Sequence, residues 1–457
     1  MAVIGGGISG LAAAHWLDRS GCRVKLYEAS TRLGGVVKTA FLEDVVVEEG
    51  PDALLSRADI IELCHSLGLG GDLVAPAVFG GHIWTRRGLR ALPRGIVLGL
   101  PASPVAAVRS GLLSPWAGMR AGLEVMTPRR LAGPDVSVGK LVAERFGAGV
   151  AEGLVDPLLA GRRAGMPEDI SLAAAEPAID ALARTNRSLI LGLRRAVRRG
   201  EAGAPPGFLA PAGGMERLVD ALRGAMRAVE IRTGTPVTSI TQGTGATYAV
   251  STTGNAPVSV DGVVIALPTH AAAPLIGPLS TAAARELAAI GYASTAVVSF
   301  VYPPGAGAPP VGGSGFLVPS ARGKITAACT WYSAKWPAAT PRDGALVLRA
   351  FVGRAGHEPA LEWDDDRLAA AIDMELRSAM TLTRSPRTWK VSRWDRSLPE
   401  YTVGHKALVA RLEKALAAHA TVALCGAGYR GSGIPDCIAG AEKAAAAVRG
   451  QIPAATK

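Results

Sequence analysis

The chain has 457 residues, of which 49% are apolar and 19% charged, and it carries a formal net charge of +11. This composition excludes a disordered chain and predicts a globular protein of two or three domains, because single cores rarely exceed about 250–300 residues. The positive charge favours an acidic small substrate, a nucleic acid or an anionic membrane surface, but no nucleic-acid-binding module is recognised. The five cysteines are odd in number and lack metal-ligand spacing, which predicts reduced thiols and no metal site.

No leader or membrane-spanning segment is expected. The first predicted strand begins at Ala2, which leaves no room for a signal peptide. Two uncharged stretches, residues 262–284 and 287–321, are interrupted by prolines too often to form one spanning helix. We therefore expect a cytoplasmic protein, for which peripheral contact with the inner face of the membrane stays open.

A glycine-rich turn lies between the first predicted strand, Ala2–Ile4, and the helix that follows. Gly5, Gly7 and Gly10 form the pattern G-x-G-x-x-G at this junction, which is the context that a dinucleotide-binding fingerprint requires. The first glycine permits the tight turn, the second lets a pyrophosphate approach the backbone, and the third lets helix and strand pack closely. The N-terminus of the helix then faces the phosphates with free N–H groups and a partial positive charge.

An acidic residue stands where a ribose would be bound. Glu28 ends a second predicted strand, Arg23–Tyr27, about 20 residues after the glycine-rich turn, so that it can accept the ribose hydroxyls. Two glycines and two cations follow within Arg32–Thr39, and a further turn, Glu48–Asp52, comes after a valine strand. A chain that binds NAD would more often continue directly into another βα unit.

The Arg32–Thr39 segment resembles the R-x-G-G-x-x-x-T sequence that follows the ribose acid in the flavin amine oxidase and protoporphyrinogen oxidase superfamily. The resemblance implies FAD as the cofactor, bound in an extended conformation. Two C-terminal segments narrow the resemblance to the porphyrinogen oxidases within this superfamily. Trp394–His405 resembles W-x(4)-P-x-Y-x-x-G-H, and Gly431–Ile438 has the form G-x-G-[IVL]-x-D-C-I, which is that of the porphyrinogen oxidases. A helix beginning there would direct its N-terminus at the flavin pyrimidine edge.

The resemblance implies a set of cofactor contacts along the chain. The residues expected to contact FAD are Gly5, Gly6, Gly7, Ile8, Ser9, Gly10, Glu28, Ala29, Arg32, Gly34, Gly35, Val36, Gly50, Pro51, Asp52, Ala53, Val237, Trp394, Gly426, Ser432, Gly433 and Ile434. No catalytic acid or base is assigned, because hydride transfer to the flavin N5 is chemistry that the cofactor supplies.

The middle of the chain departs from the nucleotide-binding pattern and is rich in arginine. Asp156–Gly165 resembles the D-P-L-x-x-G-[IV]-[YF]-A-G segment of the porphyrinogen oxidases, but Arg162 and Arg163 replace an aliphatic and an aromatic residue. These two cations either bind propionates or point away. Six arginines between Asp180 and Glu201 are interpreted as a solvated face, a membrane-surface patch or a lid over an anionic substrate.

Two further segments are candidates for substrate contact. Ile83–Arg94 is predicted to form a hairpin whose arginines are either solvated or paired with carboxylates. Alternating residues between Ser294 and Val352 predict an antiparallel sheet, which would form the floor beneath a flat substrate. The residues expected to contact the substrate are Arg94, Gly161, Arg162, Arg163, Phe316 and Leu317. The aromatic side chains of this sheet have plain core packing as their alternative role.

The likeness, which covers residues 1 to about 450, implies an α/β fold (α+β overall) with a Rossmann-like FAD-binding domain, a mixed-sheet substrate domain and a mostly helical insertion. The expected division is 1–80, 206–270 and 406–450 for the FAD-binding domain, 81–95 and 271–405 for the substrate domain, 96–205 for a helical domain that associates with a membrane or forms a lid, and 451–457 for a tail.

The implied function is oxygen-dependent oxidation of a porphyrinogen to a porphyrin in haem biosynthesis, with release of hydrogen peroxide. Leu92–Pro101 and Arg349–Pro359 resemble segments of the Gram-positive type, which oxidises coproporphyrinogen III; its four propionates suit an arginine-rich chain. Protoporphyrinogen IX, with two propionates, is the alternative substrate. A flavin amine oxidase, a carotenoid desaturase, a nucleic-acid-binding protein and a flavin-binding homologue without catalysis remain more distant alternatives. Partnership with a downstream haem-pathway enzyme stays open.

Overall fold

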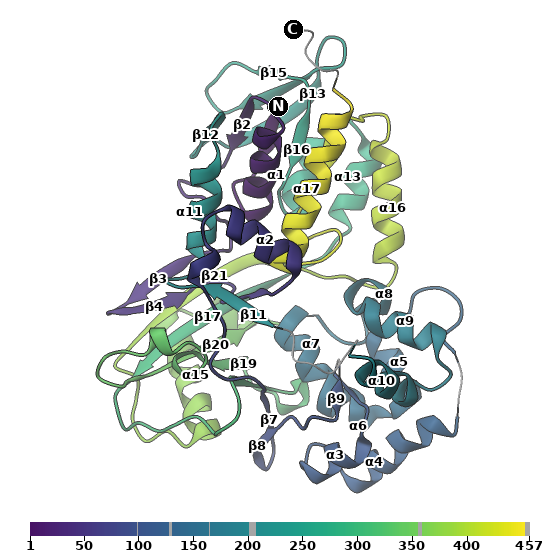
Figure 1. The fold of residues 1–457 in the computed structure, drawn as a ribbon, viewed down its shortest axis with the longest axis vertical. Helices are drawn as coiled ribbons and strands as arrows, with labels where there is room; N and C mark the ends of the chain where they lie inside the picture. Colours follow the sequence, from purple (N-terminus) through teal and green to yellow (C-terminus); the bar gives the residue numbers. More distant parts are fainter. Residues whose placement is uncertain (98, 128–129, 164, 201–206, 355–358, 453–457) are drawn as a thin grey trace.

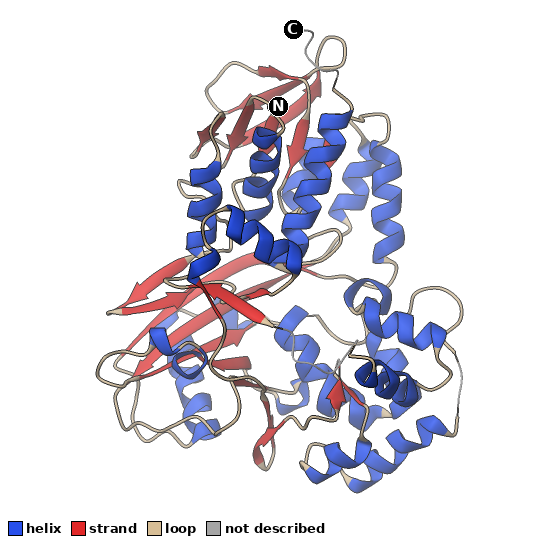
Figure 2. Cartoon of the chain, viewed as in Figure 1, coloured by secondary structure: helices blue, strands red, loops and turns tan. Residues whose placement is uncertain are grey.

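The computed structural model describes residues 1–452 except 98, 128–129, 164, 201–206 and 355–358, and the side chains of residues 160–163 also lie outside the described part. Helices and strands separate into three units (Figures 1 and 2). A parallel-sheet unit holds the N-terminus at the top of the view, a second sheet lies below it, and a cluster of helices lies beside that sheet. We refer to these as the parallel-sheet, mixed-sheet and helical units.

The parallel-sheet unit is built from segments that are far apart in the sequence. Its five strands lie in the order β12-β2-β1-β16-β22, and each adjacent pair is parallel. Their bounds are β1 Ala2–Ile4, β2 Val24–Tyr27, β12 Val229–Arg232, β16 Val263–Ile265 and β22 Val422–Leu424. Because side chains alternate along a strand, Val3 faces one layer while Ala2 and Ile4 face the other, and all three are buried.

Helices cover one face of this sheet, and a second sheet with further helices covers the other. The first layer comprises α1 (Ile8–Arg19), α2 (Ala58–Ser66), α11 (Glu216–Ala225) and α17 (Ile434–Gly450). The second comprises the antiparallel strands β13 (Val237–Gln242), β14 (Tyr248–Thr252) and β15 (Val258–Val260) with helices α12 (Thr269–Ile276), α13 (Thr281–Ala288) and α16 (His405–Leu416). Both layers are apolar, so the central strands β1 and β16 are buried from both sides.

The mixed-sheet unit is a seven-stranded sheet in the order β21-β17-β20-β19-β18-β7-β8. Its strands are β7 His82–Thr85, β8 Gly88–Ala91, β17 Tyr292–Tyr302, β18 Gly315–Leu317, β19 Thr326–Trp331, β20 Leu346–Val352 and β21 Thr388–Pro399. The strands between Ser294 and Val352 pair antiparallel, as expected, and the early hairpin joins their edge through a parallel pairing of β18 with β7, so the whole sheet is mixed. Helix α15 (Asp365–Met380) packs against one face.

The helical unit has its own core. Its helices are α3 Pro104–Arg109, α4 Pro115–Gly122, α5 Val138–Phe146, α6 Ala148–Val150, α7 Asp156–Arg163, α8 Leu172–Ala175, α9 Pro177–Thr185 and α10 Leu189–Arg198, with the short strands β9 (Ile96–Val97) and β10 (Leu100–Pro101). Glu124 is fully buried there, 3.1 Å from Arg145, and accepts hydrogen bonds from the Ser188 hydroxyl and the Leu189 N–H. Among the described residues, no helix is long and apolar enough to cross a membrane.

After the helical unit, β11 returns the chain to the parallel-sheet unit, where short strand pairings lie. Strand β11 (Phe208–Pro211) pairs with β5 (Leu54–Leu55) and β6 (Leu73–Val74), and β3 (Thr39–Leu42) pairs with β4 (Val45–Glu48) beside them. Glu48 joins these elements, since its carboxylate accepts the Met215 N–H at 2.7 Å and the Thr39 hydroxyl at 2.9 Å. Burial raises the pKa of Glu48 to about 7.

The raised pKa of Glu48 predicts that folding stability falls with increasing pH. The folded state holds this proton up to about pH 7, whereas the unfolded chain releases it near pH 4.5, so the unfolding free energy decreases between these values. Urea midpoints measured from pH 5 to pH 8 should fall less steeply in Glu48→Gln than in the parent protein. Glu62→Gln, on an exposed position of α2, serves as the control and should leave the slope unchanged. An unchanged slope in Glu48→Gln would contradict the prediction.

Candidate functional site: a glycine cradle between two sheets

The predicted pyrophosphate site is formed by two glycine turns that face each other. Gly7 and Gly34 form a parallel bridge, and the Gly34 N–H donates to the Gly6 carbonyl at 2.8 Å. A Cβ atom added to Gly7 would meet only the Gly35 Cα, at 3.9 Å, so the space above Gly7 is open. Gly35 has a φ of +59°, which turns the second loop toward the first. The two turns therefore leave a strip of bare backbone.

The other two fingerprint glycines are required by the fold itself. Gly5 has a φ of +104°, and a Cβ atom on Gly10 would lie 1.7 Å from the Gly5 carbonyl oxygen. Gly10 thus lets α1 begin directly against β1, as the sequence pattern predicts. Gly7 is the N-cap of α1 and makes no side-chain capping bond. The first N–H groups of α1 are accordingly directed at the open strip, where an anion would be favoured.

Glu28 is held beside this strip at the end of β2. Its backbone bonds to Arg232 and Thr235, and its carboxylate accepts the Gly6 N–H at 2.6 Å and the Ser30 N–H at 2.8 Å. The residue is half-buried, so the carboxylate remains accessible to ribose hydroxyls. Ala29 follows it on the exposed side.

Arg32 shapes the second glycine turn from inside. Its guanidinium donates to the carbonyls of Leu33 and Val37, at 2.8 Å and 3.2 Å, and to that of Gly35. The side chain therefore satisfies the carbonyls of the turn, while a contact between Arg32 and the cofactor remains a prediction. Val36 is 42% exposed beside the turn.

The Gly50–Ala53 segment packs against the same turn. A Cβ atom on Gly50 would lie 1.9 Å from the Val36 carbonyl oxygen, so glycine is required there. The Asp52 carboxylate is bound to the mixed-sheet unit, at 2.8 Å from the Lys335 Nζ and 3.4 Å from the Arg349 Nη1. Its expected cofactor contact would therefore have to come from backbone atoms.

Arg349 was not predicted as a site residue, although it is the one charged residue in the apolar strand β20. It is fully buried, donates to the Gly50 carbonyl at 2.6 Å and lies 5.3 Å from the ring centres of Tyr332 and Phe351. A charge in the middle of an apolar strand was the available signal, because such a group is buried only with a partner.

The C-terminal segment closes the site from the other side. Helices α1 and α17 lie side by side with their N-termini toward the mixed sheet (Figure 1). Gly433 is the N-cap of α17 and, like Gly7, makes no side-chain capping bond. Ile434 and Pro435 begin the helix, and Asp436 forms a 2.7 Å ion pair with Arg57. The partial positive charge of a second helix is thus directed at the same region.

A tyrosine fastens the loop that precedes α17. The Tyr401 hydroxyl donates to the Ala427 carbonyl and accepts the Gly431 N–H at 2.7 Å, so it connects both ends of the loop between Gly426 and Ser432. The Tyr401 ring stacks on His405 at 4.1 Å, and the His405 Nε2 lies 3.0 Å from the Tyr429 carbonyl oxygen. Both residues belong to the Trp394–His405 motif, but their role became visible only in three dimensions.

Removing the Tyr401 hydroxyl should loosen this loop without unfolding the protein. In Tyr401→Phe the Gly431 N–H and the Ala427 carbonyl lose a shared partner, at a cost of about 1–3 kcal/mol. We expect about tenfold faster release of bound flavin in a dilution assay and a shifted flavin absorbance spectrum. Tyr248→Phe, whose hydroxyl faces His419 in another layer, is the control. Equal release rates in the two variants would exclude the proposed clamp.

Two further predicted contacts lie beside the site. The Trp394 indole N–H donates to the Glu49 carbonyl at 2.7 Å, which places its ring against the strand that leads to Gly50. Val237 opens β13 shortly after the segment that bonds to Glu28. Whether either one touches a cofactor remains a prediction.

The substrate candidates occupy different environments. Phe316 is 1% exposed and packs edge-on against Trp84, 6.0 Å away, within the core beneath α15. Phe316 is thus on the face that α15 covers, while its neighbour Leu317 points to the opposite face because side chains alternate. Arg94 is exposed between β8 and β9. Gly161, Arg162 and Arg163 lie in α7, but their side chains are outside the described part.

The arrangement fits an extended dinucleotide that carries a flavin. The bare strip at Gly7 admits a pyrophosphate, Glu28 can accept ribose hydroxyls, and the N-terminus of α17 lies where an electron-accepting ring could be stabilised. Within the described part of the chain, no group of three or more histidine, cysteine or acidic side chains is arranged to hold a metal ion.

Comparison with known proteins identifies the family to which this protein belongs. The family described as flavin containing amine oxidoreductase matches residues 8–449, and the chain belongs to this family. It is 32% identical to coproporphyrinogen III oxidase of Bacillus subtilis, covering 95% of each chain, and 30% identical to protoporphyrinogen oxidase of Bos taurus, covering 99% of this chain and 98% of that one. A provisionally assigned protoporphyrinogen oxidase structure from Exiguobacterium sp. 255-15 superimposes with a TM-score of 0.88 at 30% identity, covering 99% and 98%.

These findings confirm the resemblance to the porphyrinogen oxidases and the expected fold class, a Rossmann-like domain with a mixed-sheet domain and a helical insertion. They also confirm that the protein is a flavin-dependent oxidoreductase with FAD as its cofactor.

Proposed function

We propose that this protein oxidises coproporphyrinogen III to coproporphyrin III, with molecular oxygen as the final acceptor. The observation that carries the proposal is the likeness over nearly the whole chain to proteins named coproporphyrinogen III oxidase, at 32% identity in Bacillus subtilis and 33% in Mycobacterium tuberculosis. Loss of six electrons converts the porphyrinogen into the aromatic porphyrin, and each electron pair reduces one oxygen molecule to hydrogen peroxide.

The residues of this chain supply binding and electrostatics for that reaction. When bound, FAD supplies the hydride acceptor, so the protein needs no nucleophile or metal of its own. The strip between the two glycine turns, together with Glu28, would hold the nucleotide half of FAD. The N-terminus of α17 would stabilise negative charge on the flavin ring. Tyr401 keeps the loop before α17 in place, and the mixed sheet supports the region from below.

Cationic side chains would recognise the propionates of the substrate. We assign this role to Arg94, Arg162 and Arg163, of which Arg94 is exposed between β8 and β9. A guanidinium makes a bidentate pair with a carboxylate, and four propionates offer more partners than two. Protoporphyrinogen IX is the second candidate substrate, favoured by the likeness to the Bos taurus enzyme.

Anaerobic reduction of the flavin tests both substrates directly. The FAD-loaded protein is mixed with coproporphyrinogen III or protoporphyrinogen IX, and we expect the first to bleach the flavin faster and to yield fluorescent porphyrin when air is admitted. Arg94→Ala, Arg162→Ala and Arg163→Ala should raise the KM for coproporphyrinogen III. If neither porphyrinogen bleaches the flavin, the proposal fails; if only protoporphyrinogen IX does, the substrate assignment is wrong.

We also propose that the helical unit contacts an anionic membrane surface. Val105 on α3, Trp116 and Met119 on α4, and Met126 just beyond it are 51–77% exposed. Arg109 is an exposed cation at the end of α3. Exposed apolar side chains beside basic residues suit insertion among acidic headgroups.

Vesicle flotation tests this surface. The protein should float with phosphatidylglycerol vesicles and not with phosphatidylcholine vesicles, and Trp116→Asp should reduce the floating fraction several-fold. Phe41→Asp is the control, because Phe41 is 73% exposed on β3 in another unit. Equal flotation of both variants would contradict the proposal.

A further inference from the structure

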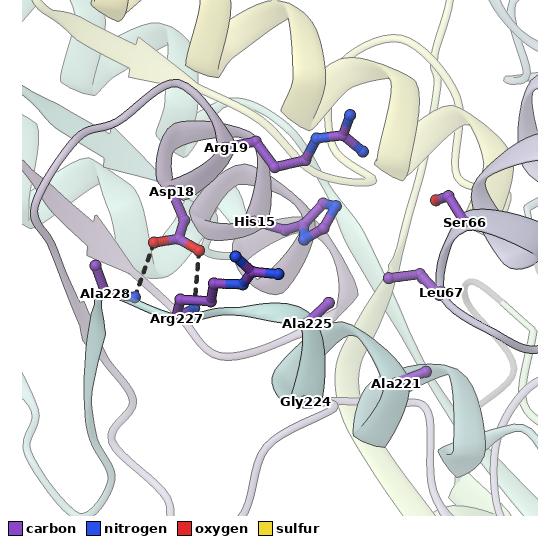
Figure 3. Close-up of a pocket in the computed structure, with 10 residues that line it drawn as sticks. All are labelled: His15, Asp18, Arg19, Ser66, Leu67, Ala221, Gly224, Ala225, Arg227 and Ala228. Carbon is purple, nitrogen blue, oxygen red and sulfur yellow. Dashed lines mark hydrogen bonds between the residues drawn. The ribbon is translucent and has the colours of Figure 1, made fainter.

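A cleft opens at the end of α1 that is opposite to the glycine-rich turn. Its volume is about 800 Å³, and the C-terminal parts of α1, α2 and α11 form its walls. Figure 3 shows side chains from these three helices around it. The volume is within the range of small-molecule sites. The two glycine turns and the N-terminus of α17 lie at the other end of α1. The cofactor site and this cleft therefore do not overlap.

The inner wall of the cleft contains a buried polar group. His15 is 3% exposed, and neither of its ring nitrogens has a hydrogen-bond partner in the described part of the chain. Burial lowers the pKa of His15, so that at neutral pH the ring is uncharged and offers one donor and one acceptor. Buried polar groups in proteins are almost always hydrogen-bonded, and a ligand in the cleft would meet this requirement.

The rim of the cleft carries more positive than negative charge. Arg19 and Arg227 lie on it, and among the described residues neither guanidinium has an ion-pair partner. The third charged group, Asp18, is already engaged, since its carboxylate accepts the backbone N–H groups of Arg227 and Ala228, both at 2.9 Å. Figure 3 shows Arg227, which lies just beyond the end of α11, and His15 of α1 among the residues around the cleft, so donors from two segments of the chain line it.

The remaining side chains of the wall are apolar except for Ser66, whose hydroxyl already donates to the Leu63 carbonyl at 2.8 Å. Leu67 at the end of α2 and Ala221 and Ala225 on α11 are half-buried and offer only hydrocarbon to the cleft. An inorganic anion would leave this apolar surface without a contact. An organic acid would instead pair its carboxylate with the cationic rim and pack its hydrocarbon part against the apolar wall. We propose that the cleft binds a small organic carboxylate, with its carboxylate between Arg227 and His15 and its hydrocarbon part against Leu67 and the α11 alanines.

Calorimetric titration of the FAD-loaded protein tests this site, with hexanoate, succinate and phosphate as the three probes. We expect one hexanoate per chain, bound at least tenfold more tightly than phosphate, with succinate between them because it lacks an apolar end. Arg227→Gln should weaken hexanoate binding at least tenfold. Arg223→Gln is the matched control, since Arg223 is an exposed cation in the last turn of α11, shortly before Arg227, but lies outside the cleft.

A second variant keeps the test independent of charge. His15→Phe replaces a buried ring by an apolar one, so the protein should remain folded and retain FAD while hexanoate binding weakens. Absence of saturable hexanoate binding would overturn the proposal, and so would equal losses in Arg227→Gln and Arg223→Gln. Tighter binding of phosphate than of hexanoate would overturn the assigned ligand class. Binding is measured without substrate turnover, so these outcomes do not depend on whether a porphyrinogen is the substrate.

Discussion

Replacing Gly7 by valine should give a folded but colourless protein. The new Cβ atom would meet only the Gly35 Cα, at 3.9 Å, so the polypeptide can accept it. The branched side chain would nevertheless fill the bare strip between the two glycine turns, where the pyrophosphate must approach the backbone. We expect FAD affinity to fall at least a hundredfold, measured by flavin absorbance after gel filtration and by fluorescence titration of the apoprotein.

The neighbouring fingerprint glycine provides the contrast. In Gly10→Val the Cβ atom would lie 1.7 Å from the Gly5 carbonyl oxygen, so α1 could not pack against β1 and the protein should fail to fold. Circular dichroism distinguishes the two outcomes, because Gly7→Val should keep the parent spectrum. Stoichiometric FAD in purified Gly7→Val would show that the strip is not the pyrophosphate site.

Replacing Asp52 by asparagine should strongly destabilise the contact between the parallel-sheet and mixed-sheet units. Asp52 is the carboxylate partner of Lys335 and of the fully buried Arg349, and it also accepts the Trp336 indole N–H at 3.3 Å. A neutral amide would leave these cations without compensation. Breaking a buried ion pair in this way typically costs about 3–5 kcal/mol, and urea unfolding followed by tryptophan fluorescence measures the loss.

An exposed ion pair supplies the control. Asp72→Asn removes the partner of Arg217 at the surface, which should cost less than about 1 kcal/mol. If Asp52→Asn loses no more than this control, the buried cluster contributes nothing to stability. Lys335→Met in the Asp52→Asn background should restore part of the loss, because one uncompensated cation is removed.

The same cluster predicts an acid-dependent loss of stability. Burial alone would raise the pKa of Asp52, but the charges of Lys335 and Arg349 outweigh it and hold the pKa below the ordinary value of 3.8. The stabilisation is therefore complete above about pH 4 and is lost as the pH falls through the lower folded-state pKa. In Asp52→Asn this part of the acid dependence should be absent.

Local patterns predicted the elements of the fold with few errors. Glu28 lies directly after β2, as the spacing from the glycine-rich turn predicts, and α17 begins at Ile434, within the segment where the resemblance implies a helix. Such signals act over a few residues, so the sequence expresses them directly.

Side-chain roles were harder to predict. Phe316 and Leu317 were both expected to contact the substrate, but adjacent residues of a strand point to opposite faces, and only the position of α15 decides which face is core. Arg32 was assigned to the cofactor on resemblance, while its guanidinium is engaged by carbonyls of its own turn. These contacts stay predictions, and the packing around the three side chains is not written in local sequence.

By itself, the sequence determined the cofactor class of this protein: Gly5, Gly7, Gly10 and Glu28 require a particular local geometry, and that geometry binds a dinucleotide. The tertiary structure decided which parts of the chain surround the strip between the two glycine turns. It brought β1, β16 and β22 together from the start, the middle and the last part of the chain, set α17 beside α1, and buried Arg349 against Asp52. The physical reason is range: backbone strain and capping act between neighbours, whereas burial and charge pairing join residues that only folding makes adjacent.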